Sequence, residues 1–131
     1  MLLPSNTSTN KLASPSNVEG GSAGLLLEVP VSSGTTYDYQ KNFALVTSLI
    51  LCNKTSSGLS VSAKIVNGST SANLLNNQNL PPNYSYDLIT GNKLILKEGD
   101  KLYVWHNSPS ANSLDSILSY TLHRPISTYD I

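Results

Sequence analysis

The chain has 131 residues, which is room for one domain with a single hydrophobic core. Only 12% of its residues are charged, the formal net charge is zero and Lys and Arg do not cluster, which argues against binding to nucleic acid or to an anionic membrane surface. Its polarity comes instead from 21 Ser, 14 Asn and 10 Thr residues, which favour turns and strands over helices.

The first 22 residues are expected to form a unit of their own, an extended or flexible N-terminal arm. Ser, Asn and Thr dominate this segment, and Leu2, Leu3 and Leu12 are its main candidates for burial. Such a segment buries too little apolar surface to offset its own ordering entropy. It is therefore either a floppy tail or an arm that becomes ordered by lying across a neighbouring subunit.

Residues 23–124 show the pattern of a β-sandwich domain. Short apolar or alternating segments recur roughly every ten residues and are separated by Gly, Pro, Asn and Ser turns. The predicted strands are 25–31, 43–52, 59–65, 72–80, 84–88, 94–96, 102–105 and 114–122. We therefore expect an all-β fold, an antiparallel sandwich of about eight strands that resembles a jelly roll, followed by a C-terminal tail at residues 125–131.

The predicted strand at residues 43–52 is apolar on both of its faces. A strand of this kind should be covered on both sides. The sandwich core is expected to cover one face, and the other is expected to be covered by the arm, by a loop or by another subunit.

The predicted strand at residues 102–105 alternates between two kinds of side chain. If Leu102 and Val104 face the core, Tyr103 and Trp105 point outward. Tyr and Trp suit surfaces that are half dry and half wet, so this pair would stack on a sugar ring or pack against a protein. The alternative is that the domain itself covers both faces of this strand.

Residues that could support catalysis or bind a metal are scattered. His106 and His123 each end a predicted strand and are expected to be solvated, while Cys52 has no second cysteine with which to bind zinc. Glu98 and Asp100 share one turn, but calcium sites gather more carboxylates than this. Phosphate-binding glycine loops and nucleophile elbows are missing as well. We therefore predict that the chain is not an enzyme and binds neither a metal nor a cofactor.

Membrane insertion and secretion are not expected either. No apolar run reaches the roughly 18 residues of a transmembrane helix. Residues 1–5 lack the basic and apolar regions of a signal peptide. Cys52 is the single cysteine, so no disulfide can form within the chain, and a secreted adhesion domain is disfavoured.

Three segments resemble small virion structural proteins of tailed bacteriophages, particularly cyanophages. Ser48–Ser62 carries a Leu-Cys-Asn sequence followed by Thr/Ser and then a Val/Ser strand, and Leu94–Val104 carries a hairpin with a Gly-Asp turn. Ser116–Tyr120 is similar to the final strand of those proteins. The resemblance spans roughly residues 25 to 122 and implies a β-sandwich without catalytic residues, present in many copies on the virion.

On this basis we predict a capsid decoration or cement protein, assembled in the host cytoplasm and located in the virion. Its expected partners are copies of itself and the major capsid protein or neck and tail proteins, with no nucleic acid and no membrane. Its predicted interaction residues are Leu2, Leu3, Leu12, Tyr103 and Trp105. Two alternatives remain: an accessory protein of the neck, tail or fibres, and a carbohydrate-binding module on a receptor-binding appendage.

Overall fold

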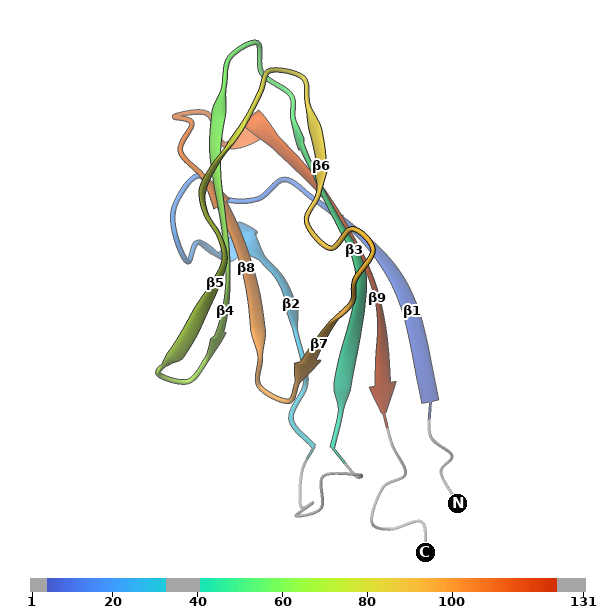
Figure 1. Cartoon of the computed structure of the whole chain (residues 1–131). Coiled ribbons are helices and arrows are strands. Elements are labelled where there is room, and N and C mark those ends of the chain that lie inside the picture. Colours follow the sequence, from blue (N-terminus) through green and yellow to red (C-terminus); the bar gives the residue numbers. More distant parts are fainter. Residues whose placement is uncertain (1–4, 33–40, 125–131) are drawn as a thin grey trace, which may run out of the picture.

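Two antiparallel β-sheets pack face to face in the computed structural model, which describes residues 5–32 and 41–124 (Figure 1). This architecture confirms the predicted all-β sandwich. Within the described ranges there are nine strands, close to the eight expected. They are β1 (Ser5–Ala13), β2 (Leu25–Glu28), β3 (Phe43–Asn53), β4 (Leu59–Asn67), β5 (Thr70–Leu80), β6 (Ser85–Asp87), β7 (Leu94–Lys97), β8 (Lys101–His106) and β9 (Leu114–Arg124).

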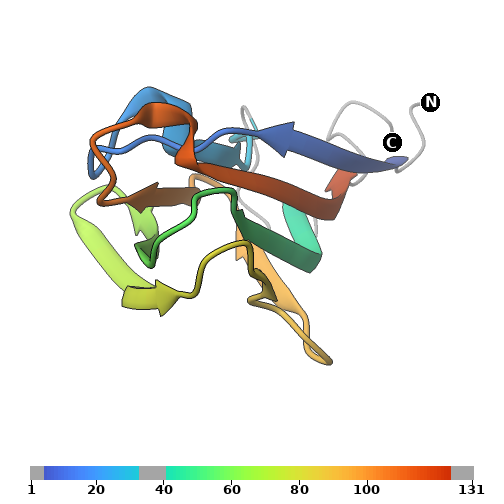
Figure 2. The same ribbon diagram turned by 90° about the horizontal axis from the view of Figure 1, so that it is seen from above.

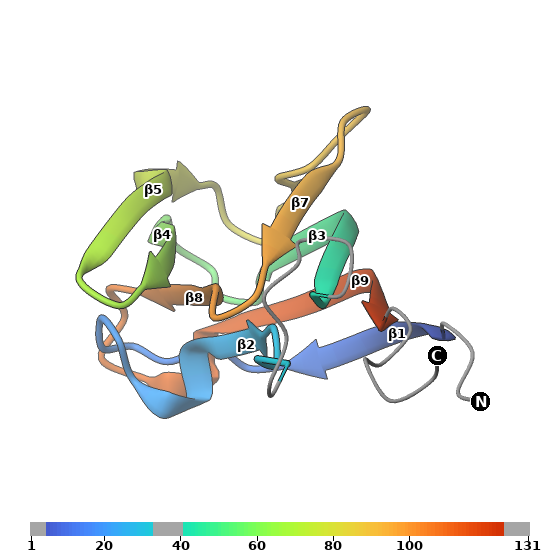
Figure 3. The same ribbon diagram turned by 90° about the horizontal axis from the view of Figure 1, so that it is seen from below.

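The strands are divided between two sheets of different composition. Sheet A has the order β1-β9-β3, and both β6 and β7 pair with the remaining side of β3. Sheet B has the order β2-β8-β4-β5. In the end-on views, β1 lies beside β9 at one margin of the molecule and β5 lies at the opposite margin (Figures 2 and 3).

The hydrophobic core lies between the two sheets and is built from the inward side chains of their strands. Alternation places every second residue of a strand on this inner side. The buried side chains are almost all Leu, Val or Ala, and removing one such Leu or Val from water stabilises the fold by about 1.5–3 kcal/mol. The largest are Leu26, Leu49, Leu51, Leu80, Leu96, Leu102, Leu114 and Leu118.

Strand β1 belongs to the segment that the sequence assigned to an arm outside the sandwich. It pairs with β9 along its whole length, from Ser5 opposite Arg124 to Ala13 opposite Ser116. Backbone hydrogen bonds to β9 supply stabilisation that this mostly polar strand does not gain from apolar burial. The predicted limit at residue 22 thus falls in the connection between β1 and β2. Leu2, Leu3 and the predicted tail at residues 125–131 lie outside the described residues.

Candidate interaction surface

Strand β1 forms an exposed edge of sheet A. Seven of its nine residues are exposed, so little apolar surface holds it in place. Polar side-chain pairs join it to β9: the Ser8 and Thr121 hydroxyl oxygens lie 3.1 Å apart, and the Ser119 hydroxyl donates to Asn10 Oδ1 at 2.7 Å. Within β1, Ala13 packs against the core. The strand is therefore held mainly by its backbone ladder and by these polar pairs.

The outer face of sheet A, which we call the A face, carries a first apolar cluster on β1, β9 and β3. Leu12 lies opposite Ile117, and Ile117 lies opposite Ile50. Leu12 is 73% exposed and Ile117 is 39% exposed. A shallow hollow of about 520 Å³ lies beside them, lined also by Ala13 and Asp115. This cluster presents apolar surface directly to solvent.

A second apolar cluster lies at the other end of the A face. Phe43 is 38% exposed and lies opposite His123, with 4.7 Å between the two ring centroids. Ile95 on β7 is 64% exposed and lies opposite Leu45. The Asn6 amide oxygen contacts Nδ1 of His123, so β1 reaches this end as well.

A polar band separates the two clusters. It consists of short uncharged side chains from β1, β3 and β9, which are Ser8, Asn10, Thr47, Ser48, Ser119 and Thr121. Strand β3 has a bulge here between Val46 and Ser48, and the Thr47 hydroxyl donates to the Ser119 carbonyl at 3.3 Å. A hollow of about 200 Å³ lies in the band. The A face is thus apolar at both ends and polar in the middle.

The outer face of sheet B differs, because the connection between β1 and β2 runs alongside β8 and places the Glu19 side chain on this face. Ser16 forms an isolated parallel bridge with Trp105. Lys64 Nζ lies 5.3 Å from the centre of the Trp105 ring and 2.9 Å from Glu19 Oε2, so a cation and its carboxylate partner flank the indole. Leu102 and Val104 are fully buried, whereas Tyr103 and Trp105 on the other face are half-buried.

His106 is buried, which corrects the expectation of a solvated histidine. It is 2% exposed because the connection after β1 and the loop after β8 both fold against the end of β8. The Ser108 N–H donates to His106 Nδ1 at 3.2 Å, while the buried Nε2 has no hydrogen-bond partner among the described residues. Burial lowers the pKa of His106, and backbone groups of Ala111 and Pro15 offset this shift in part.

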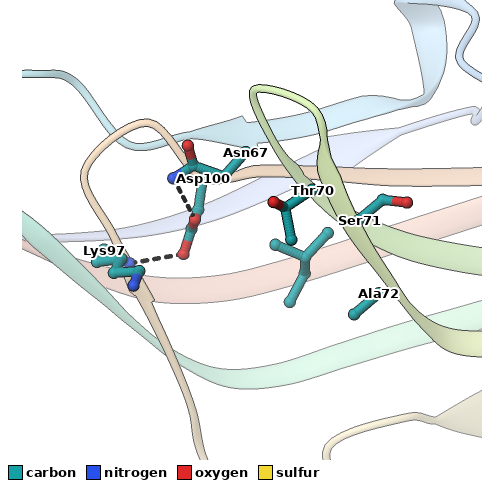
Figure 4. Close-up of a pocket in the computed structure, with 7 residues that line it drawn as sticks. Asn67, Thr70, Ser71, Ala72, Lys97 and Asp100 are labelled. Atoms are coloured by element: carbon teal, nitrogen blue, oxygen red, sulfur yellow. Dashed lines mark hydrogen bonds between the residues drawn. The ribbon is translucent and has the colours of Figure 1, made fainter.

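In the turn Lys97–Asp100, hydrogen bonds from the protein itself engage both carboxylates. Asp100 accepts hydrogen bonds from the Lys97 N–H at 2.9 Å and from Asn67 Nδ2 at 2.8 Å (Figure 4). Glu98 accepts from the N–H groups of Ser32 at 2.7 Å and Asn42 at 2.9 Å, and from the Ser32 hydroxyl.

Partial burial would raise the pKa of Glu98. The hydrogen bonds from Ser32 and Asn42, with Lys41 nearby, outweigh this and hold the pKa below its usual value. Across residues 5–32 and 41–124, no group of three or more His, Cys, Asp or Glu side chains is placed to hold a metal ion. The turn has a structural role, because its carboxylates fix the ends of neighbouring segments.

Of the five interaction residues named from the sequence, three are described. Leu12 lies on the A face, while Tyr103 and Trp105 lie on the outer face of sheet B. Ile95 and Ile117, which were not among the predicted interaction residues, share the A face with Leu12. Alternation along each strand could have shown that both side chains point away from the core. The sequence did not show that their strands lie in the same sheet.

Comparison with known proteins gives no family assignment. No protein-family model matches the chain, and no curated protein does. A solved structure titled "Bacillus endospore appendages form a novel family of disulfide-linked pili" is similar over 95% of this chain and 88% of its own, at 11% sequence identity and a TM-score of 0.43. The described residues contain no helix long and apolar enough to cross a membrane.

Proposed function

We propose that this chain is a non-enzymatic structural protein that assembles in many copies, with strand β1 acting as the tether between them. The observation that carries the proposal is the placement of β1, an exposed polar edge strand that stays paired with β9 chiefly through its backbone. A strand of this kind makes the same hydrogen bonds whether it comes from its own copy or from a neighbour.

The two long edge strands of the sandwich differ in a way that supports this role. The ladder of β5 with β4 contains two irregularities, and Asn77 in β5 has a positive φ of 52°. Bulges of this kind twist an edge away from further pairing. The β1–β9 ladder is regular over nine residue pairs. A neighbour's β1 therefore finds an uninterrupted template along β9 once the resident strand has left.

The proposal also includes a more specific statement, which is the kind of particle that these copies help to build. The resemblance of Ser48–Ser62 and Leu94–Val104 to phage virion proteins favours a capsid decoration or cement protein, with a neck, tail or fibre accessory protein as the alternative. Partners would then include the major capsid protein or neck and tail proteins. Carbohydrate binding at Trp105 has less support, because Lys64 and Glu19 flank the ring on which a sugar would stack.

The tether is tested by deleting residues 1–13 and measuring oligomer mass by light scattering. We expect the deletion to abolish assemblies that depend on exchanged strands and to leave the edge of β9 open. A synthetic peptide of residues 5–13 should then bind the truncated protein, whereas a scrambled peptide of the same composition should not.

Full-length and truncated proteins that assemble to the same mass would contradict the tether. The particle assignment has a separate test, which is the copy number of the protein in purified virions. Absence from purified particles would remove the virion assignment and leave the tether untouched.

A further inference from the structure

The A face is apolar surface that the described chain leaves open. Four of its large apolar side chains, Leu12, Phe43, Ile95 and Ile117, are between 38% and 73% exposed. They come from four different strands and form two clusters rather than isolated contacts. Clustered apolar surface of this kind marks an interaction site.

From this arrangement we infer that the A face binds the A face of a second copy, as a two-fold symmetric pair. Along β9, Ile117 and His123 are six positions apart, which corresponds to about 20 Å at about 3.3 Å per residue. A two-fold axis through the polar band would set the Leu12–Ile117 cluster of one copy on the Phe43–Ile95 cluster of the other. Each cluster then finds an apolar partner, and the polar bands meet at the axis.

The size of the face agrees with that of a stable interface. Strands β3 and β9 each contain 11 residues, so the face is about 36 Å long. Four strands about 4.8 Å apart make it about 19 Å wide. The resulting area of roughly 700 Å² is close to the roughly 800 Å² per partner that a standard interface buries.

The charges on the A face also complement one another across such an axis. Asp115 and Asp87 lie at the end that carries the Leu12–Ile117 cluster, where Lys54 pairs with Asp115 at 3.1 Å. Lys97 lies opposite Phe43 at the other end. Because Lys54 neutralises one of the two carboxylates, these three groups leave one net negative charge at this end, and the two-fold arrangement brings it toward the Lys97 of the other copy.

The test is a charge-reversal pair that exploits the proposed symmetry. Ile117→Lys and Ile95→Glu each place two unpaired charges in a dimer of identical variants, because each position is used twice. We expect each variant alone to weaken association by roughly a hundredfold. In an equimolar mixture, Lys at 117 of one copy meets Glu at 95 of the other, while the second contact keeps both isoleucines. The mixture should therefore recover association.

Sedimentation velocity over a concentration series of the full-length chain gives the readout, and circular dichroism confirms that each variant is folded. Val18→Glu is the control, because Val18 is 61% exposed and lies in the connection between β1 and β2. This control should associate as the unmodified chain does. A full-length chain that stays monomeric, or variants that both retain its mass, would overturn the inference, as would a mixture that shows no recovery.

This inference does not depend on the exchange of β1. Ile95→Glu separates the two, because deletion of residues 1–13 also removes Leu12 from the A face. Deletion of residues 1–13 that dissociates the protein while Ile95→Glu leaves its mass unchanged supports the tether and overturns the face contact. Deletion that leaves the mass unchanged while Ile95→Glu dissociates the protein supports the face contact and contradicts the tether.

Discussion

The two outer faces of the sandwich differ in how their large side chains are covered. Both sheets carry large side chains on the side away from the core. On sheet B the chain provides its own partners, with Lys64 lying over the Trp105 indole and pairing with Glu19. On sheet A, Leu12 and Ile95 remain largely exposed. The difference indicates that sheet B is completed within one chain, whereas sheet A is left available for another.

The largest expected effect compares the inner and outer sides of β3. Leu49 is fully buried, so Leu49→Ala should lower the free energy of unfolding by about 2–5 kcal/mol through lost burial and a residual cavity. Leu45 is half-buried on the A face. In the isolated chain, Leu45→Ala should therefore lower the free energy of unfolding by less than about half the loss expected for Leu49→Ala. Urea denaturation at low protein concentration measures both. Equal losses would mean that the A face is already covered within one chain.

Aromatic truncations compare the two outer faces directly. Trp105→Ala removes a half-buried ring with partners from the chain itself and should lower the free energy of unfolding by about 2 kcal/mol. Phe43→Ala on the A face should cost about 1 kcal/mol in a dilute, monomeric sample. Limited proteolysis should also show faster cleavage of residues 14–21 in the Trp105 variant alone. Equal losses of unfolding free energy for the two variants would contradict the proposed difference between the two faces.

Lowering the pH should reduce the stability of the fold through His106, which is buried at the end of β8. Because the folded-state pKa is lowered, the unfolded chain binds the proton first. The contribution to stability is complete above the unfolded-state pKa of about 6.5 and is lost as pH falls through the lower folded-state pKa. His106→Asn keeps an acceptor for Ser108 without a titrating ring. Denaturation midpoints measured from about pH 7.5 down to about pH 5 should fall more for the unmodified chain, and parallel profiles would contradict this role.

The smallest effect is expected for the ion pair that flanks Trp105. The Glu19 side chain is 62% exposed, so Glu19→Gln should change the free energy of unfolding by about 0.5 kcal/mol or less, and salt should screen that difference. Lys64→Met, which keeps the aliphatic contact with the ring, is the matched variant. Thermal denaturation at low and high salt provides the measurement. A loss as large as that of Trp105→Ala would show that the cover of sheet B is mainly electrostatic.

The strands with buried apolar side chains could be predicted from the sequence, because burial leaves a recognisable pattern of residues. Strand β1 was missed, because it is mostly polar and exposed. Leu and Val at alternate positions reveal β4 and β8, since the core selects those residues directly. Strand β1 is mostly Ser, Thr and Asn, and its stabilisation comes from backbone groups that every sequence possesses. Alternation therefore carried no signal at Ser5–Ala13, although the segment pairs with β9 over its full length.

The candidate site depended on strand order, which local patterns do not encode. Leu12 was identified as an unusual apolar residue in a polar segment, but its place beside Ile117 requires pairing between residues more than one hundred positions apart. The burial of His106 likewise depends on two separate segments meeting at the end of β8. Such contacts are set by the global packing of the sheets, and short motifs do not report them.

The pairing of Ser5 with Arg124 has a mechanical consequence. Both residues lie at the same end of the β1–β9 ladder, so a force that pulls them apart acts along the hydrogen bonds rather than along the strands. The ladder then opens one pair at a time, as a zipper does, and never carries the load on all nine pairs together. Stretching the chain by these two points should peel β1 away at low force while the core between the sheets stays intact.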